Sequence, residues 1–236
     1  TSNPTVGLTT PNTGYNTIDN NTTATTSANG RAVASVASGY PLATISQANA
    51  VSYCSTAGGS LITNAEWMTI ARNIEGQLSN WTTGTAVSTA VGVGSLYRGH
   101  SDNSPGVALE AGPDANGYIG TNNSGFSIER RTHTLSNGEV IWDMGGNVHE
   151  WTRDTIQAQN KPNSNSRSIW QEWTVMSNYG SLSYDLTRPS NSSWNSNQGM
   201  GMYYAGTVTG TTDYTFLRGG VWAGLGYSGI FSLSLD

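Results

Sequence analysis

The fold is decided by the stretch Trp142-Asp143-Met144-Gly145-Gly146-Asn147-Val148-His149-Glu150-Trp151. Its Gly-Gly pair predicts a tight turn, and the alternating residues after the turn predict a segment that packs Val148 and Trp151 inward. A second stretch, Phe216-Leu217-Arg218-Gly219-Gly220-Val221-Trp222, lies far away in the sequence and has a similar pair of glycines after apolar residues. On the residues alone, the first stretch is predicted to anchor a sheet.

The composition is neutral and polar. Charged residues make up only 11% of the 236 residues, against roughly 25% in an average soluble protein. Asn, Ser, Thr and 29 Gly take their place, while 8 Trp and 11 Tyr supply enough apolar area for a sizeable core. Such a chain fits one β- and loop-rich domain with extensions. We expect an extracellular protein, displayed on a virion or a cell surface.

The charge pattern argues against two classes of partner. The net charge is −5, and the ten Lys and Arg residues are scattered, which argues against nucleic acid and against an anionic membrane surface. No segment approaches the ~20 apolar residues of a membrane span, so we expect no membrane insertion. The single cysteine, Cys54, cannot form an intrachain disulfide and is predicted to be a small buried apolar residue.

The chain is predicted to have an arm and one domain. Residues 1–30 are rich in Thr, Asn and Ser, which favours a poorly ordered arm, or an extended strand lying on the domain or on a neighbour. The domain is placed at residues 31–236, with an insertion at 155–212 that is rich in Asn, Ser, Tyr and Trp. Long structured loops are expected over 80–127, where Gly, Ser and Asn dominate.

Two helices are predicted early in the chain. Ser46 is the expected N-cap of the first, which runs to about Ala57. Thr63 and Glu66 fit a capping box that starts the second, and Gly76 can close it. Each has apolar residues at helical spacing: Ala50, Val51, Cys54 and Ala57 in the first, and Trp67, Ile70, Ala71 and Ile74 in the second.

Strands are expected later in the chain. Asn137-Gly138 predicts a hairpin between residues 131–135 and 139–142, and further strands are expected over 214–222 and 230–235. In the last one, apolar and polar residues alternate, with Phe231, Leu233 and Leu235 on one face and Ser232, Ser234 and Asp236 on the other. On pattern alone this is an ordinary edge strand after a glycine-rich loop.

The two stretches quoted first, together with residues 45–74, resemble the formylglycine-generating enzyme (sulfatase-modifying factor) branch of the C-type lectin fold. The resemblance covers roughly residues 35–154 and 214–236, and it implies a single α+β domain of that fold. Enzymes of the branch bind copper through two cysteines after the second motif, and those places hold Gly224 and Gly229 here. The resemblance therefore implies a scaffold without its copper chemistry, which favours binding over catalysis.

The same resemblance implies a structural calcium ion. In the family, the turn of the first stretch supplies calcium with the carboxylate and carbonyl oxygens that this cation prefers. Carried over to this sequence, the ligands are the side chains of Asp143 and Glu150 and the carbonyls of Gly146 and Val148. No other cofactor is expected, because the three histidines show no metal-binding spacing.

The C-terminal pattern Arg-Gly-Gly-x-Trp followed by Gly-x-Phe-x-Leu-x-Leu is similar to the variable region of diversity-generating retroelement proteins. There, an error-prone reverse transcriptase rewrites adenines in a template copy, so that Asn codons become many residues while fold-determining codons are spared. The resemblance implies a variable region at about 218–236. Its ligand-contacting positions would be Val221, Ala223, Gly224, Gly226, Tyr227, Ser232, Ser234 and Asp236. The structural anchors would be Trp222, Phe231, Leu233 and Leu235, with Trp151 in the first stretch.

The sequence therefore predicts a non-enzymatic display protein that binds a protein or glycan ligand on a target surface. Multivalent display would favour a homo-oligomer. One alternative is a structural virion, tail or cell-surface module whose C-terminal segment does not vary. Another is an oxidase of the formylglycine-generating type, against which the missing cysteines at positions 224 and 229 argue.

Overall fold

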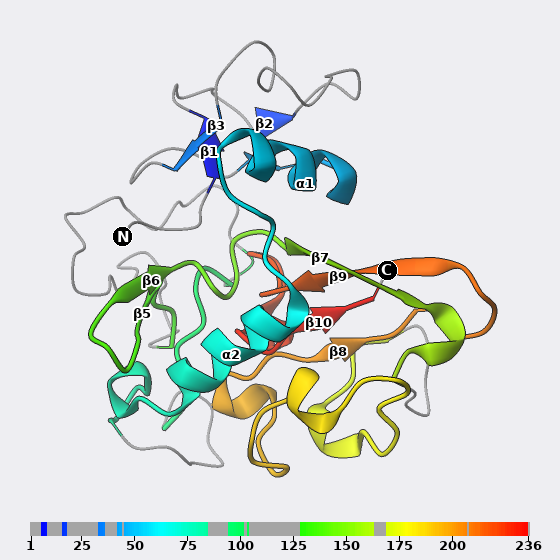
Figure 1. Cartoon of the computed structure of the whole chain (residues 1–236). Coiled ribbons are helices and arrows are strands. Elements are labelled where there is room, and N and C mark those ends of the chain that lie inside the picture. The colour runs from blue at the N-terminus through cyan, green and yellow to red at the C-terminus, as the bar shows by residue number, and fades with distance from the viewer. Residues whose placement is uncertain are drawn as a thin grey trace. The chain divides into compact units, whose positions relative to one another are not determined.

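The computed structural model describes the following residues: 6–8, 16–17, 33–35, 42–43, 45–84, 94–101, 103, 128–162, 169–206 and 208–235. Figure 1 follows the chain from its blue N-terminal to its red C-terminal end. The chain divides into two compact units, Thr1–Ile62 and Thr63–Asp236. Most of the loops expected over 80–127 lie outside the described residues, and so does Asp236.

The first unit holds short strands and one helix. Strand β1 (Val6–Leu8) pairs antiparallel with β3 (Val33–Ser35), and β2 (Asn16–Thr17) pairs parallel with β4 (Leu42–Ala43). Two segments of the expected arm are therefore strands. Helix α1 (Gln47–Thr56) begins as predicted, because the Ser46 hydroxyl oxygen accepts a hydrogen bond from the Asn49 N–H at 3.2 Å.

The buried face of α1 differs from the predicted stripe. Ala50 and Tyr53 are buried, whereas Val51 is exposed. The prediction that Cys54 is buried is wrong, because this residue is only half-buried. The Tyr53 ring has much more apolar area than a thiol or a valine, so the orientation that buries it is favoured. The partial burial of Cys54 still raises the pKa of its thiol.

In the second unit, helix α2 (Asn64–Glu75) confirms the predicted capping box. The Thr63 N–H donates to Glu66 Oε2 at 2.8 Å, and the Glu66 N–H donates to Thr63 Oγ1 at 3.2 Å. The helix closes at Gly76. It buries Trp67, Met68, Ala71 and Ile74. The Trp67 indole N–H also donates to the Ile230 carbonyl at 2.8 Å, which ties the helix to the C-terminal segment.

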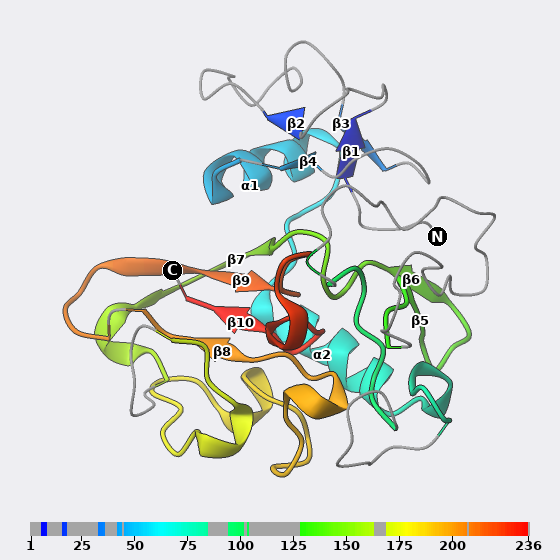
Figure 2. The same cartoon turned by 180° about the vertical axis from the view of Figure 1, so that it is seen from behind.

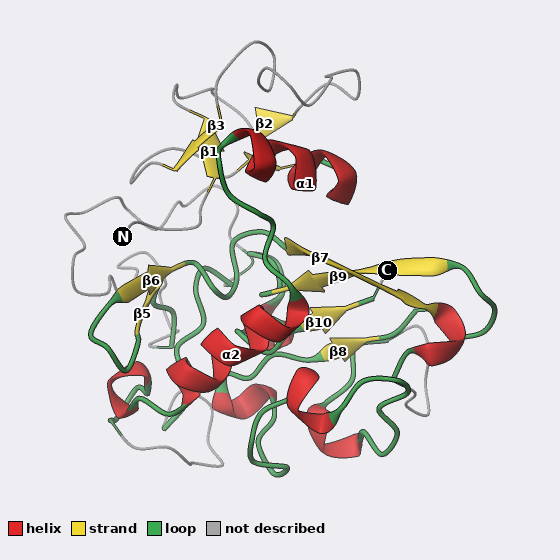
Figure 3. Cartoon of the chain, in the orientation of Figure 1, coloured by secondary structure: helices red, strands yellow, loops and turns green. Residues whose placement is uncertain are grey.

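Four described strands form the main sheet, in the order β7 (Glu150–Gln157), β9 (Asp213–Arg218), β10 (Leu233–Ser234) and β8 (Tyr203–Tyr204). Figure 3 shows them in yellow. β9 runs antiparallel to both β7 and β10, while β10 and β8 are parallel. The predicted edge strand is therefore an interior strand, because the insertion contributes β8 beside it.

The inward face of β7 also differs from the prediction. Val148 and Trp151 are only half-buried, and the buried residues of the strand are Thr152 and Ile156. The register between β7 and β9 shifts between Trp151 and Thr155. Such a bulge reorients the side chains on either side of it, which the alternating pattern of the sequence does not reveal.

A second small sheet confirms the predicted hairpin. β5 (Thr132–Thr134) pairs antiparallel with β6 (Val140–Trp142). Gly138 lies in the connecting turn with a φ of +83°, which a glycine adopts without strain. The remaining described elements are 3-10 turns at Leu78–Asn80, Ala158–Asn160, Trp173–Val175, Tyr184–Leu186, Ser196–Gln198 and Leu225–Tyr227.

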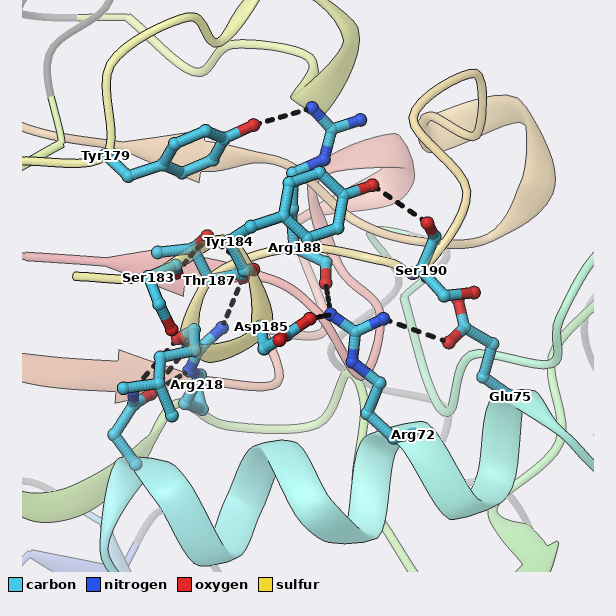
Figure 4. A network of polar contacts seen from close by, with 12 residues as sticks. Arg72, Glu75, Tyr179, Ser183, Tyr184, Asp185, Thr187, Arg188, Ser190 and Arg218 are labelled. Carbon is cyan, nitrogen blue, oxygen red and sulfur yellow. Dashed lines mark hydrogen bonds and ion pairs between the residues drawn. The ribbon is translucent and has the colours of Figure 1, made fainter.

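Polar contacts fasten the insertion to α2 (Figure 4). Arg72 on the helix donates to the carbonyl oxygen of Arg188 at 2.9 Å and lies 3.4 Å from the Asp185 carboxylate. Glu75 Oε1 accepts the Ser190 N–H at 2.9 Å, and the Tyr184 hydroxyl donates to the Ser190 carbonyl at 2.8 Å. The insertion is thus part of the domain framework.

These elements make a mixed α+β, loop-rich fold. Among the described residues, no helix is both long enough and apolar enough to cross a lipid bilayer.

Candidate functional site

The two motif stretches form one hydrogen-bonded unit. In the β7–β9 ladder, Glu150 stands opposite Arg218. Beyond the strands, the Gly146 N–H donates to the Gly219 carbonyl and the Trp222 N–H donates to the Asn147 carbonyl, both at 2.9 Å. The turn of the first stretch therefore supports the loop that follows the second.

Close packing explains the glycine in this turn. Gly146 has a φ of +71°, and a Cβ there would stand 2.2 Å from the carbonyl oxygen of His100. The next N–H, that of Asn147, donates to that same oxygen at 2.7 Å. A side chain at position 146 would break this contact between backbones.

Arg218 holds the second stretch in place from inside the core. Its side chain is fully buried. It donates to Asn64 Oδ1 and to three backbone carbonyls, those of Leu186, Thr187 and Phe231, at 2.6–3.3 Å. Burial lowers the pKa of Arg218 to about 9, so the guanidinium is still charged at neutral pH. It joins α2, the insertion and the C-terminal segment.

The carboxylates of the implied calcium site lie in different environments. Arg131 donates to both oxygens of Asp143, from Nε at 2.8 Å and from Nη2 at 2.6 Å. Glu150 Oε2 is inaccessible to solvent and has no hydrogen-bond partner among the described residues. Burial, with the nearby charge of Asp143, raises the pKa of Glu150 well above its ordinary value.

The Glu150 carboxylate fits a cation, whereas the Asp143 carboxylate is already paired with Arg131. An unpartnered buried carboxylate oxygen costs free energy that a bound cation would recover, so Glu150 suits the calcium role. Asp143 would have to be shared with Arg131. The described residues contain no cluster of three or more His, Cys, Asp or Glu side chains that could hold a metal, so backbone carbonyls would have to complete the site.

The predicted contact positions separate into exposed and buried groups. Tyr227 is 45% exposed, and Val221, Ala223 and Gly226 are half-buried. Gly224 is buried, and a Cβ there would stand 2.1 Å from the Ser228 hydroxyl oxygen. That hydroxyl accepts the Val221 N–H at 2.9 Å and donates to the Val221 carbonyl at 2.7 Å, so it cannot move without cost.

Two of the implied ligand-contacting positions, Ser232 and Ser234, are buried and not accessible to a ligand. They are 0% and 4% exposed. β8 pairs with β10, and a Cβ on Gly201, two residues before β8, would stand 2.9 Å from the Ser232 Cβ. The insertion therefore covers this part of the chain. Asp236 lies outside the described residues.

The predicted anchors are buried to different depths. Phe231, Leu233 and Leu235 are fully buried. Trp222 is half-buried, like Trp151. The C-terminal segment is thus anchored by its last strand, and its exposed part is the 3-10 turn Leu225–Tyr227.

Leu225 occupies an unusual backbone conformation at that turn. Its φ is +46°, and its side chain is 43% exposed. Its N–H donates to the Ser101 carbonyl, and its carbonyl accepts from Arg98 Nη1, both at 2.9 Å. Burial lowers the pKa of Arg98 to about 10, and the Glu129 charge opposes that shift. A buried cation therefore holds the turn in a conformation that leucine disfavours.

An aromatic cluster that the sequence did not predict lies beside the turn. Trp170 stacks with Tyr227 at 5.5 Å between centroids and 4° between planes, and with His149 at 6.3 Å and 11°. Tyr204 lies 5.6 Å from Trp170. We call His149, Trp170, Tyr204 and Tyr227 the aromatic patch. The richness of the insertion in Trp and Tyr was the only sequence signal for it.

The chain is similar to a known protein family. The model of the sulfatase-modifying factor enzyme 1-like domain matches residues 9–232. No curated protein and no solved structure matches the chain.

Proposed function

Because the chain belongs to the sulfatase-modifying factor enzyme 1-like domain family, we propose that it uses this scaffold, in the C-type lectin fold, to bind a ligand. Its C-terminal segment is the variable region of a diversity-generating retroelement protein, displayed on a virion or a cell surface. The observation that carries the proposal is the exposed turn Leu225–Tyr227 on a fully buried strand. Residues can change at such a turn while the core stays constant.

Two positions support binding over oxidation. The copper-binding cysteines of the family's enzymes correspond to Gly224 and Gly229, and Cys54 is the only cysteine in the sequence. A Cβ at position 229 would stand 2.4 Å from the Gly199 carbonyl oxygen, and the Gly229 backbone has a φ of +156°. A side chain at position 229 would require the backbone to move, and one at position 224 would displace the Ser228 hydroxyl.

The packing narrows the set of variable positions. Val221, Ala223, Gly226 and Tyr227 are at least partly accessible, and Leu225 joins them because it is exposed. Leucine, like the other four residues, is reachable from an Asn codon by changing adenines alone. Gly224, Ser232 and Ser234 leave this set, because any larger side chain there would overpack the interior.

We also propose a structural role for calcium at the turn of the first stretch. Glu150 would bind the ion together with Asp143 and the carbonyls of Gly146 and Val148. The unpartnered oxygen of Glu150 supports this proposal. The ion would neutralise buried negative charge and fix the turn that holds the variable loop.

The decisive experiment is to sequence the DNA around the gene. We expect a near-identical copy of the codons for residues 218–236 beside a reverse-transcriptase gene. Its mismatches should be confined to template adenines and fall at positions 221, 223, 225, 226 and 227. A locus without such a copy would exclude diversification, and a constant structural module of a virion, tail or cell surface would take its place.

A further inference from the structure

The aromatic patch joins three distant parts of the sequence on one accessible surface. His149 comes from the first motif stretch, Trp170 and Tyr204 from the insertion, and Tyr227 from the exposed turn. Tyr227 is 45% exposed and the other three are half-buried. Figure 2 shows the red turn near the end of β9, on the side of the sheet seen from behind. Ile169, next to Trp170, is 57% exposed.

Two of the segments that supply the patch, those around Tyr204 and Tyr227, contain no charged residue. No Asp, Glu, Lys or Arg stands between Arg218 and Asp236, or between Arg188 and Asp213. The nearest acid to Trp170 in the sequence is Glu172, whose carboxylate accepts both the N–H and the hydroxyl of Ser196. Arg153, four residues after His149, is exposed, and Arg167, three residues before Trp170, lies outside the described residues. The lack of charge therefore holds for the segments around Tyr204 and Tyr227, which offer no cation to a polyanion or an anionic lipid surface.

The strained turn next to the patch points to a role in binding. A leucine with positive φ is energetically unfavourable, and such strain persists where the surrounding structure enforces it, often at ligand sites. Arg98 and Ser101 enforce it at Leu225. As a result, an apolar side chain is exposed one residue away from Gly226, where a Cβ would have ordinary contacts of 3.5 Å or more.

Building on the function proposed above, we propose that the aromatic patch is the fixed part of the ligand-binding surface and that its ligand is a protein. Trp170, Tyr204 and His149 remain constant, while the turn Leu225–Tyr227 varies against them. Trp170 is the central anchor, because it contacts all three other rings. Specificity then comes from the turn, and part of the affinity comes from residues that never change.

The chemistry of the patch favours a protein over a glycan. Centres of protein interfaces are enriched in Trp and Tyr and depleted in charged residues. Exposed aliphatic side chains, those of Ile169 and Leu225, stand at the margin of the patch. They offer nothing to the hydroxyl groups of a sugar, whereas they match the apolar side chains of a protein surface.

A defined probe tests this inference. A phage-displayed library of random linear peptides would be panned against the whole chain. Each selected peptide would then be titrated against the wild type and single variants. Trp170→Ala should weaken binding about 30-fold or more, as for a central tryptophan anchor. Ile169→Glu should weaken it at least about tenfold, because it brings a charge to an exposed margin of an apolar surface.

The matched control is Leu78→Glu. Leu78 is 56% exposed, like Ile169, but lies in the turn Leu78–Asn80 beside β5. This variant should leave peptide binding unchanged. Because the Ile169 side chain is largely exposed, Ile169→Glu is not expected to disturb folding. Thermal unfolding would confirm that Ile169→Glu and Leu78→Glu both fold.

Several outcomes would overturn the inference. Peptides that bind both patch variants as tightly as the wild type would show that the ligand binds elsewhere. A panning that yields no binder would show that the patch is not a peptide-binding surface. Neutral oligosaccharides or phosphatidylcholine vesicles would also be tested. If one of them binds, if Ile169→Glu abolishes that binding and if no peptide binds, the ligand is of that class and is not a protein. If selected peptides bind through the patch but the DNA around the gene holds no template copy, the proposal of diversification fails and the proposal of a protein-binding patch stands.

Discussion

The guanidinium of Arg218 donates two hydrogen bonds to a single atom, Oδ1 of Asn64, from Nε at 2.9 Å and from Nη2 at 2.6 Å. These residues are 154 positions apart in the sequence. Asn64 opens α2, and Arg218 ends β9 where the exposed loop begins. The contact fixes the point from which the proposed binding loop departs, so the loop can vary without loosening its base.

Arg218→Lys should destabilise the protein strongly. One ammonium group cannot replace the planar fork that reaches Asn64 and three carbonyls, and unpartnered buried groups would remain. We expect a loss of about 3–5 kcal/mol in the free energy of unfolding, measured by urea denaturation. Arg72→Lys is the control, because the Arg72 side chain is partly accessible, and it should cost less than about 1 kcal/mol. Equal effects would show that the Arg218 contacts are not central.

His133 should make stability depend on pH. Burial lowers its pKa from 6.5 to about 4, so the unfolded chain binds a proton between those values while the folded chain does not. The stabilisation is complete above pH 6.5 and falls as the pH drops towards 4, by a total on the order of 3 kcal/mol. His133→Gln should flatten the curve of unfolding free energy between pH 6.5 and 4. If the unfolding free energy of the variant falls with pH as steeply as that of the wild type, other titratable groups cause the pH dependence.

Glu150→Gln tests the proposed calcium site. The raised pKa of Glu150 means that the folded protein holds its proton above the ordinary value, so stability falls as the pH rises through that folded pKa. Without calcium, the variant should therefore be more stable than the wild type at neutral pH. With calcium, the Tm of the wild type alone should rise. If calcium leaves the Tm of the wild type unchanged, the ion pair with Arg131 alone neutralises the Asp143 charge.

Substitution by asparagine, the residue that the proposed template would encode, separates variable from fixed positions. Gly226→Asn should leave the Tm nearly unchanged, because a Cβ there meets only ordinary contacts. Ser232→Asn should lower the free energy of unfolding by about 1–3 kcal/mol, since it adds volume to a fully buried site. Tyr227→Ala should alter binding but leave the Tm nearly unchanged. A tolerated Ser232→Asn would return position 232 to the variable set.

Local sequence signals predicted local structure well. The capping box of Thr63 and Glu66, the N-cap at Ser46 and the turn at Asn137-Gly138 each concern residues close together in the chain. All three are present in the structure. Their geometry depends on short-range hydrogen bonds and backbone preferences, which the residue types themselves determine.

Long-range pairing was not predictable from the same signals. Alternation put Ser232 and Ser234 on the face opposite the apolar residues, but both are buried, and β8 from the insertion lies beside β10. The aromatic patch brings together residues 149, 170, 204 and 227, which no spacing rule connects. The role of Asp143 and Glu150 was suggested by resemblance. The ion pair of Asp143 with Arg131 became visible only in the structure.

Leu225→Asn separates the cost of the strained turn from its proposed use. Asparagine tolerates positive φ better than leucine does, so the variant should relieve strain. We expect the free energy of unfolding to stay equal or to rise by up to about 1 kcal/mol, while the affinity for selected peptides falls. Leu78→Asn, at an exposed site without a positive φ, should change stability by no more than about 0.5 kcal/mol. If Leu225→Asn instead destabilises the protein by more than about 1 kcal/mol, the leucine contributes to packing, and the turn is part of the framework.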